Sequence, residues 1–236
     1  MVFNFEFAFS IIKPVLSCLP TTLLLTFWSI VCSLTLAILC GAVILNNVPV
    51  LKPVIIGVNS FIKGIPLVVQ LYFCYYALPY LLKNLDGVWI FHFDLRNLPL
   101  FQFAVIAFTL NYGAYITDIV VSSMRGVEPG QMEACMSVGM TKAQALCRIV
   151  VPQAAIISIP NMSNMFTALL KSTSLVYLIN VMDILGKARQ LAGEAYTYLE
   201  AYVVAAAIYW IVFIVVDKFM MVAEIKLSKY IAQPGA

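Results

Sequence analysis

The sequence predicts an all-α polytopic membrane protein with about five transmembrane helices. Of its 236 residues, 63% are hydrophobic and only 11% are charged, whereas soluble domains carry about 25% charged residues. Charged side chains are absent from residues 14–51, 64–82, 97–117, 149–170 and 201–216. A helix needs about 20 mainly apolar residues to cross a bilayer. Together these observations exclude an ordinary water-soluble fold, because its surface would be largely apolar.

Each charge-free stretch marks one expected crossing. We expect spans within about 15–45, 54–82, 98–124, 153–182 and 200–222. The apolar run from Val15 to Leu45 follows no basic segment and is longer than the apolar core of a signal peptide, so we expect it to remain as the first span. The chain shows no internal repeat, which predicts a single transmembrane domain over residues 1–236.

The second span contains a helix-breaking sequence. Gly64-Ile65-Pro66 must bend or break the helix, because proline lacks a backbone donor and clashes with the preceding turn. The outer part of this span is rich in tyrosine, and its tyrosines suit an interfacial belt and the wall of a pathway equally well. They are Tyr72, Tyr75, Tyr76 and Tyr80.

Two polar segments between spans are expected to be loops. Residues 83–97 include Trp89 and the only histidine, His92, which we expect to be solvated. The segment after the fourth span carries four charged residues, Asp183, Lys187, Arg189 and Glu194. The six cysteines form no C-x-x-C pair, so we expect packing residues and no metal site.

The positions of Lys and Arg favour one orientation. With the amino terminus outside and five crossings, the carboxyl terminus lies in the cytoplasm. The cytoplasmic segments then hold Lys52, Lys63, Arg125, Lys142, Arg148, Lys218, Lys226 and Lys229. The outer segments hold Lys13, Lys83, Arg96, Lys187 and Arg189. The excess of positive charge on the cytoplasmic side supports this orientation.

The segment at about 125–152 is too polar to cross the membrane, and its pattern predicts two short helices. Gly139 is placed to end the first helix in a left-handed conformation. Thr141 and Gln144 fit a capping box that begins the second helix, and we expect Pro152 to stop that helix or to change its direction. Such a small helix–turn–helix cannot bury a core of its own. It either packs on the lipid headgroups or fits a groove on a separate protein.

In this segment Glu133-Ala134 is followed by Gly139 and Pro152, a pattern that resembles the EAA loop of binding-protein-dependent ABC importers. Within that family, other stretches resemble permeases for polar amino acids, namely cystine, basic amino acids, histidine and glutamine. They are 64–70 (GIPLVVQ), 111–115 (NYGAY), 130–131 (GQ), 152–154 (PQA) and 170–175 (LKSTSL). The chain departs from the usual residues at Lys63 (Arg), Ile65 (Thr), Asp118 (Glu), Val121 (Arg), Cys135 (Ala) and Ser172 (Asp).

The resemblance implies a type I ABC importer permease with a cytoplasmic coupling loop. It implies a second permease subunit, identical or similar, a pair of ATPase subunits that bind ATP and Mg²⁺, and an extracytoplasmic substrate-binding protein. It implies no nucleic-acid partner. The chain contains no G-x-x-x-x-G-K-[ST] sequence, so we expect it to bind no cofactor and to be no enzyme itself. The residues expected to contact the ATPase are Glu133, Ala134, Cys135, Gly139, Met140 and Thr141.

Polar residues inside the spans are candidates for the substrate pathway. They are Gln70, Asn111, Asp118, Asn161, Asn164 and Lys171. Each has a structural alternative as an interhelical hydrogen-bonding group, and Asp118 and Lys171 could neutralise one another. We expect import of a polar amino acid, with cystine preferred over basic amino acids and glutamine. The competing function is a secondary amino acid transporter or channel, which would work without ATP.

Overall fold

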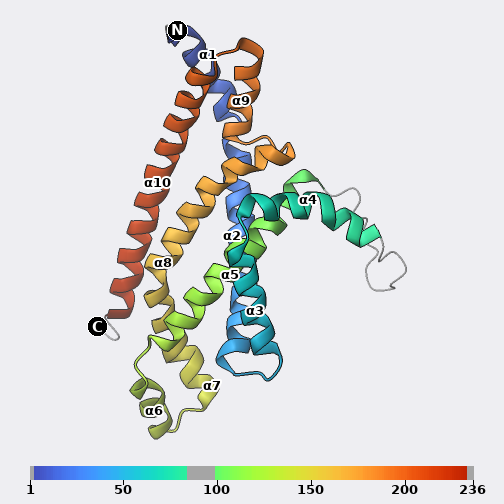
Figure 1. Ribbon diagram of the computed structural model, residues 1–236. Helices are drawn as coiled ribbons and strands as arrows, with labels where there is room; N and C mark the ends of the chain where they lie inside the picture. The colour runs from blue at the N-terminus through green and yellow to red at the C-terminus, as the bar shows by residue number, and fades with distance from the viewer. Residues whose placement is uncertain (1–2, 84–98, 233–236) are drawn as a thin grey trace.

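The computed structural model describes residues 3–83 and 99–232, and all regular structure in these two ranges is helical (Figure 1). Four helices are long and apolar enough to cross a membrane, and a bent pair of shorter helices makes a fifth crossing when counted as one broken span. The predicted fold class is therefore confirmed. The expected loop with Trp89 and His92 lies outside the described residues.

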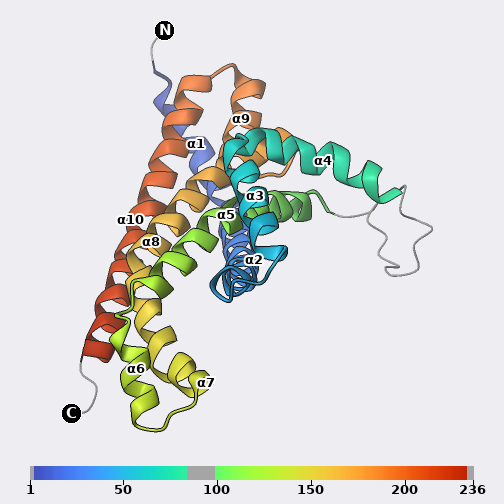
Figure 2. The same cartoon turned by 60° about the horizontal axis from the view of Figure 1, so that its bottom comes forward.

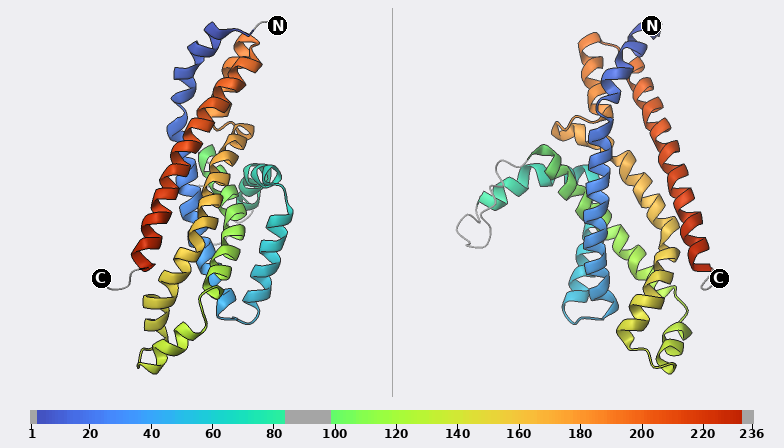
Figure 3. Two further views of the ribbon diagram at one scale, coloured as in Figure 1. Left: turned by 90° about the vertical axis from the view of Figure 1, so that its left-hand side faces the viewer. Right: turned by 180° about the vertical axis from the view of Figure 1, so that it is seen from behind.

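The helices follow one another in a simple order. They are α1 (Phe5–Leu16), α2 (Leu19–Leu45), α3 (Leu51–Gly64), α4 (Leu67–Lys83), α5 (Leu100–Arg125), α6 (Gly130–Ser137), α7 (Lys142–Ala145), the π-helical η2 (Leu146–Val150), α8 (Val151–Ser172), the 3-10 helix η3 (Thr173–Ile179), α9 (Ile184–Ala195) and α10 (Tyr198–Ala232). Figures 1 and 3 place α6 and α7 at one end of the molecule, and α1 and α9 at the opposite end.

Helices α2 and α5 form the centre of the main core, around buried Leu25, Ala37 and Phe108. Their backbones approach closely because glycine stands at the contact. A Cβ atom on Gly113 of α5 would lie 2.9 Å from Leu36 of α2. Small residues at a helix contact are typical of membrane proteins, where close packing replaces the hydrophobic driving force.

The second span breaks where the sequence predicts it. Ile65 is extended, with φ −100° and ψ 132°, because a residue before proline avoids the helical region. Helix α4 consequently leaves α3 at an angle of 106°, and Figure 2 shows it running away from the bundle. The break also places Lys63 in the last turn of α3.

The prediction that Pro152 would stop or redirect a helix is wrong. Helices α7, η2, α8 and η3 form one continuous helical segment, Lys142–Ile179. At its π-helical stretch the N–H of Val151 donates to the carbonyl of Leu146, five residues earlier. Proline has no backbone N–H group. It is tolerated here because the local change of hydrogen-bond register requires no donor at position 152.

The charged segment after the fourth span is also not a loop, because it forms helix α9. Asp183 caps this helix, accepting hydrogen bonds from the backbone N–H groups of Gly186 (2.7 Å) and Leu185 (3.3 Å). The hydroxyl of Tyr209 in α10 donates to the same carboxylate over 2.7 Å. Burial raises the pKa of Asp183, and these three hydrogen bonds oppose the shift. The periodicity of small apolar residues in α9 is the signal that the loop prediction overlooked.

Helix α1 is not among the predicted elements. It packs with α9 and α10 in a second cluster, where Ile11, Ala188 and Ala205 are buried. The backbone N–H of Asn4 donates to Glu200 Oε1 at 2.9 Å, which fixes the start of α1 to the start of α10. At the end opposite to α6, α1 and α9 pack against the beginning of α10, which then runs along the bundle and contacts α8 (Figure 1).

The close contact of α2 with α5 gives a stability prediction. Gly113→Leu should lower the free energy of unfolding by about 1–3 kcal/mol, because overpacking forces the two helices apart. The matched control is Gly57→Leu, at a helical position with no heavy atom within 4 Å of the Cβ site. Thermal unfolding of the purified protein in detergent measures both. Equal midpoints for the two variants would contradict the packing described here.

Candidate functional site

Two features stand out as candidates for function: the α6–α7 elbow at one end, and a cavity at the break between α3 and α4. The turn of the elbow has the geometry expected from its sequence. Gly139 has φ +85°, and the N–H groups of Gly139 and Met140 donate to the carbonyls of Met136 and Cys135. This pair of bonds is a Schellman motif, which satisfies the last carbonyls of α6.

The second helix of the elbow begins with the predicted capping box. Thr141 Oγ1 accepts from the N–H of Gln144 at 3.3 Å, and Gln144 Oε1 accepts from the N–H of Thr141 at 2.9 Å. Beneath the elbow, buried Val127, Val150 and Ala154 attach it to the ends of α5 and α8. The elbow is therefore fixed to the helices that cross the membrane.

The exposed surface of the elbow suits contact with another protein. Glu133, Ala134 and Gly139 are exposed as a contact surface requires, whereas Cys135 is buried. Two apolar side chains beside them, Met136 and Val138, are 55% and 77% exposed. These two side chains are absent from the predicted contact surface, although an apolar residue next to a turn in a polar segment is a usable signal.

The second feature is a cavity of about 510 Å³ at the break between α3 and α4. Asn111, which lines it, lies near the middle of α5 (Leu100–Arg125), so the cavity is at mid-height of a crossing helix. The walls come from α3, α4, α5 and α8. The lining residues are Lys63, Gly64, Ile65, Pro66, Leu67, Asn111, Tyr112, Tyr115, Met165, Ala168 and Ser172.

Gln70 holds the broken span together. Its Nε2 donates to the carbonyls of Ile62 (2.6 Å) and Ile65 (2.9 Å), and its Oε1 accepts from Asn111 Nδ2 at 3.3 Å. The helix break leaves these carbonyls without their usual partners, and lipid supplies none. Gln70 therefore serves as a structural clamp that also orients the amide of Asn111 beside the cavity.

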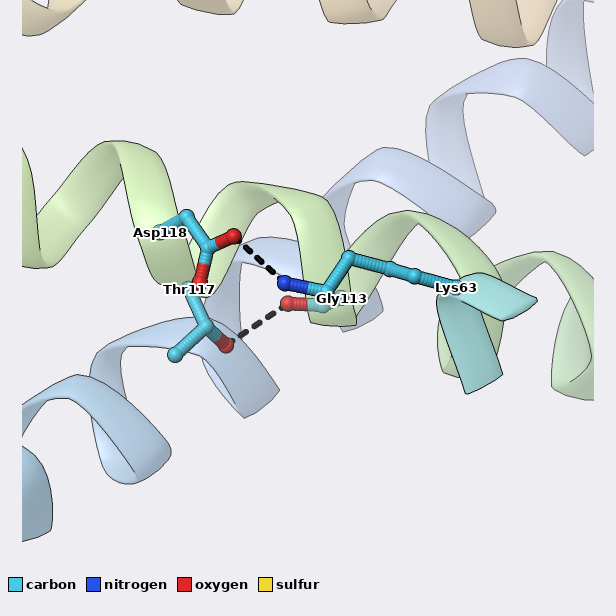
Figure 4. Close-up of polar contacts among 4 residues, drawn as sticks. All are labelled: Lys63, Gly113, Thr117 and Asp118. Carbon is cyan, nitrogen blue, oxygen red and sulfur yellow. Dashed lines mark hydrogen bonds and ion pairs between the residues drawn. The ribbon is translucent and has the colours of Figure 1, made fainter. Parts of the chain in front are cut away.

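Lys63 and Asp118 form an ion pair between α3 and α5, with Nζ and Oδ2 2.5 Å apart (Figure 4). The neighbouring Thr117 donates instead to the Gly113 carbonyl of its own helix at 2.7 Å. The pairing of Asp118 with Lys171, which the sequence left open, is thus wrong. Lys171 lies over the ring of Phe213 in α10, 4.3 Å from its centroid.

The remaining predicted pathway residues divide between two faces of α8. Asn161 is spaced four, seven and eleven residues from Met165, Ala168 and Ser172, so it continues the cavity face toward the elbow. Asn164 is likewise spaced four and eight residues from Ala168 and Ser172, whereas Lys171 turns toward Phe213. Of the six predicted pathway residues, only Asn111 lines the cavity. Gln70 is bonded to Asn111, and Asp118 is paired with the lining residue Lys63, whereas Asn161, Asn164 and Lys171 are not among the lining residues.

Three hydroxyl-bearing residues outside the predicted pathway set also line the cavity, namely Tyr112, Tyr115 and Ser172. Tyr112 Oη and Ser172 Oγ are hydrogen-bonded at 2.8 Å between α5 and α8. Ser172 was noted only as a departure from the family pattern. The four tyrosines of α4 lie elsewhere, since none of Tyr72, Tyr75, Tyr76 and Tyr80 lines the cavity. Tyr76 and Tyr80 are each 68% exposed on the arm formed by α4.

The exposed polar residues near the cavity indicate a face that does not contact lipid. The side chain of Asp118 is 62% exposed, and Tyr115, Asn161 and Asn164 are also exposed. Charged and amide groups at membrane depth are costly in hydrocarbon. This face must therefore turn toward water or toward another protein.

Comparison with known proteins adds the decisive observation. The family model for the binding-protein-dependent transport system inner membrane component matches residues 33–227, which includes the cavity, the ion pair and the elbow. The chain belongs to this family. It is a multi-pass inner-membrane permease subunit of the amino-acid ABC transporter type, as the relatives below also indicate.

Relatives of this permease match along nearly its whole length. The probable amino-acid ABC transporter permease protein PatM of Vibrio harveyi is 34% identical over 97% of this chain and 98% of its own. The L-cystine transport system permease protein TcyB of Bacillus subtilis (strain 168) is 36% identical over 90% of this chain and 86% of its own. A chain from the crystal structure of an amino acid ABC transporter with histidines superposes with a TM-score of 0.82 and 28% identity, covering 96% of this permease and 100% of that chain.

The clamp role of Gln70 can be tested by stability. Gln70→Ala should lower the free energy of unfolding by about 1–3 kcal/mol, because it removes the side-chain donor to the Ile65 carbonyl and leaves the Ile62 carbonyl with only the N–H of Ile65. Gln153→Ala is the control, since Gln153 makes one long side-chain hydrogen bond of 3.3 Å to Gln131. It should cost less than about 1 kcal/mol. Thermal unfolding that ranks the two variants in the reverse order would contradict the clamp.

Proposed function

We propose that this permease is the transmembrane subunit of an ATP-driven importer for a polar amino acid. The observation that carries the proposal is the continuous helical segment Lys142–Ile179. One end of it forms the elbow, and the other end carries Ser172 in the cavity wall. A continuous helical segment of 38 residues that joins an exposed elbow to a polar cavity is suited to convert a force on the elbow into a change of the cavity.

The motor in this proposal is a separate pair of ATPase subunits, which bind ATP and Mg²⁺. Their contact surface on this permease comprises Glu133, Ala134, Gly139 and Thr141, with Met136 and Val138 as apolar anchors. The acidic side chain would pair with a basic group, and the anchors would fill a groove. ATP-driven closure of the ATPase pair would then move the elbow and bias the permease between two openings.

The other partners follow from the exposed surfaces. A second permease, identical or similar, would face the exposed polar side of α5 and α8, so that Asp118 and Asn161 line a shared aqueous path. The elbow would lie in the cytoplasm, with the amino terminus and α9 outside. An extracytoplasmic binding protein would deliver the substrate at that outer end.

Cystine is the preferred substrate in this proposal. Two relatives bear the name of L-cystine transport system permease, TcyB at 36% and TcyL at 32% identity. A basic amino acid or glutamine is the next choice. The relatives also include a nopaline transport system permease. Cystine is preferred because TcyB is more similar in sequence to this permease than the nopaline permease is.

Reconstituted transport tests the proposal. The permease, its ATPase and its binding protein are placed in proteoliposomes, and uptake of labelled cystine, arginine and glutamine is measured with and without ATP. We expect uptake that requires both ATP and the binding protein. Uptake that proceeds without ATP and collapses when the ion gradient is dissipated would instead identify a secondary transporter or channel.

The elbow assignment gives a prediction at its turn. Gly139→Val should abolish stimulation of the ATPase by substrate-loaded binding protein, because a β-branched residue at φ +85° is strained by roughly 1–2 kcal/mol. Membrane insertion should survive.

The matched control for this position is Gly139→Asn, because asparagine tolerates the left-handed conformation and should retain most of the stimulation. ATP hydrolysis by the purified complex and the amount of membrane-inserted permease are both measured. Normal stimulation in Gly139→Val would contradict the role of the elbow.

A further inference from the structure

The charges around the cavity balance one another. Lys63 is the only charged residue among those that line it, and its ammonium group is paired with Asp118. The side chains of Lys63 and Asp118 are 26% and 62% exposed, so both remain accessible to a ligand. The cavity with its ion pair therefore has no net charge.

The ion pair lies where a ligand can contact both partners. Lys63 is part of the cavity wall. Asp118 is spaced seven and three residues from Asn111 and Tyr115 on α5, so it extends the same face of that helix. The carboxylate of an α-amino acid can replace Asp118 as the partner of Lys63, and its ammonium group can then pair with Asp118. This exchange keeps every charge paired.

The other hydrogen-bonding side chains of the wall are all neutral. They are the amide of Asn111 and the hydroxyls of Tyr112, Tyr115 and Ser172. Such groups can bind an amide, a hydroxyl or a second neutral zwitterion on the substrate side chain. They cannot neutralise a cationic side chain, and a charge left without a counter-ion at membrane depth is costly.

We propose that the cavity selects α-amino acids with a neutral, hydrogen-bonding side chain over those with a cationic side chain, with Lys63 as the anchor for the substrate carboxylate and Ser172 as the position that sets the side-chain class. This inference rests on the proposed function, because it takes the cavity as part of the amino acid pathway. A second identical copy of the permease would contribute the same balanced pair, and the charge argument would be unchanged.

Direct binding to the permease–ATPase complex, without binding protein, tests the selection. The complex is placed in nanodiscs, and binding of radiolabelled L-glutamine, L-cystine, L-arginine and L-lysine is measured by scintillation proximity. The neutral pair should bind at least about tenfold more tightly than the cationic pair. Equal affinity for glutamine and arginine would overturn the proposal, as would the absence of saturable binding for all four.

The role of Ser172 is tested by adding the missing counter-ion. Ser172→Asp should tighten arginine binding by about tenfold or more and weaken glutamine binding. The matched control is Ser174→Asp, which adds the same charge two residues further along, where the side chain does not line the cavity. It should not improve arginine binding. An equal gain in the two variants would show a general charge effect and refute the assignment of Ser172.

The role of Lys63 is tested with a substrate that lacks the carboxylate. The unmodified complex should bind L-glutamine much more tightly than L-glutaminamide, and Lys63→Gln should remove most of that difference. The comparison within each variant separates loss of the anchor from loss of folding. An unchanged preference for the carboxylate in Lys63→Gln would exclude Lys63 as the anchor.

These outcomes are distinguishable from failure of the proposed function. If arginine binds as well as glutamine while ATP-dependent uptake persists in proteoliposomes, the selection is wrong and the importer remains. If uptake requires no ATP, the importer is wrong whatever the cavity binds.

Discussion

A helix that breaks inside a membrane needs hydrogen-bond partners for the carbonyls that the break exposes. The cavity between α3, α4, α5 and α8 depends on how this permease supplies those partners. Pro66 and the extended Ile65 open the second span. Gln70 then bonds the carbonyls of Ile62 and Ile65 and holds Asn111 beside the opening. The break turns α4 aside and leaves Lys63 facing α5. Without this internal clamp, neither the cavity nor its ion pair would have a stable position.

The cavity and the elbow are mechanically connected, because a single helical segment carries residues of both. Ser172 and Ala168 belong to the cavity wall, and Thr141 begins the same segment at the elbow. The π-helical stretch Leu146–Val150 lies between them, close to the elbow. A local change of hydrogen-bond register is a site where a long helix can bend. At the far end, α1, α9 and the start of α10 share their own buried cluster.

Much of this arrangement could be predicted from local sequence. The break at Pro66, the left-handed Gly139 and the capping box of Thr141 each follow from the backbone chemistry of a few neighbouring residues, and all three were predicted correctly. Contacts between distant residues were not predictable in the same way. The partner of Asp118 is Lys63, 55 residues away, and no local pattern distinguishes it from Lys171. The charge of Asp183 predicts a loop. Its hydrogen bond from the hydroxyl of Tyr209 depends on tertiary structure, which local sequence does not reveal.

The ion pair between Lys63 and Asp118 has a consequence for the idle transporter. An isolated carboxylate at the middle of a membrane would attract protons and sodium ions, and an isolated ammonium group would attract anions. Because each group neutralises the other, this pair presents no net charge that could draw an ion to the cavity. The pair that is proposed to receive a zwitterion thus also keeps the cavity electrically neutral while no substrate is bound.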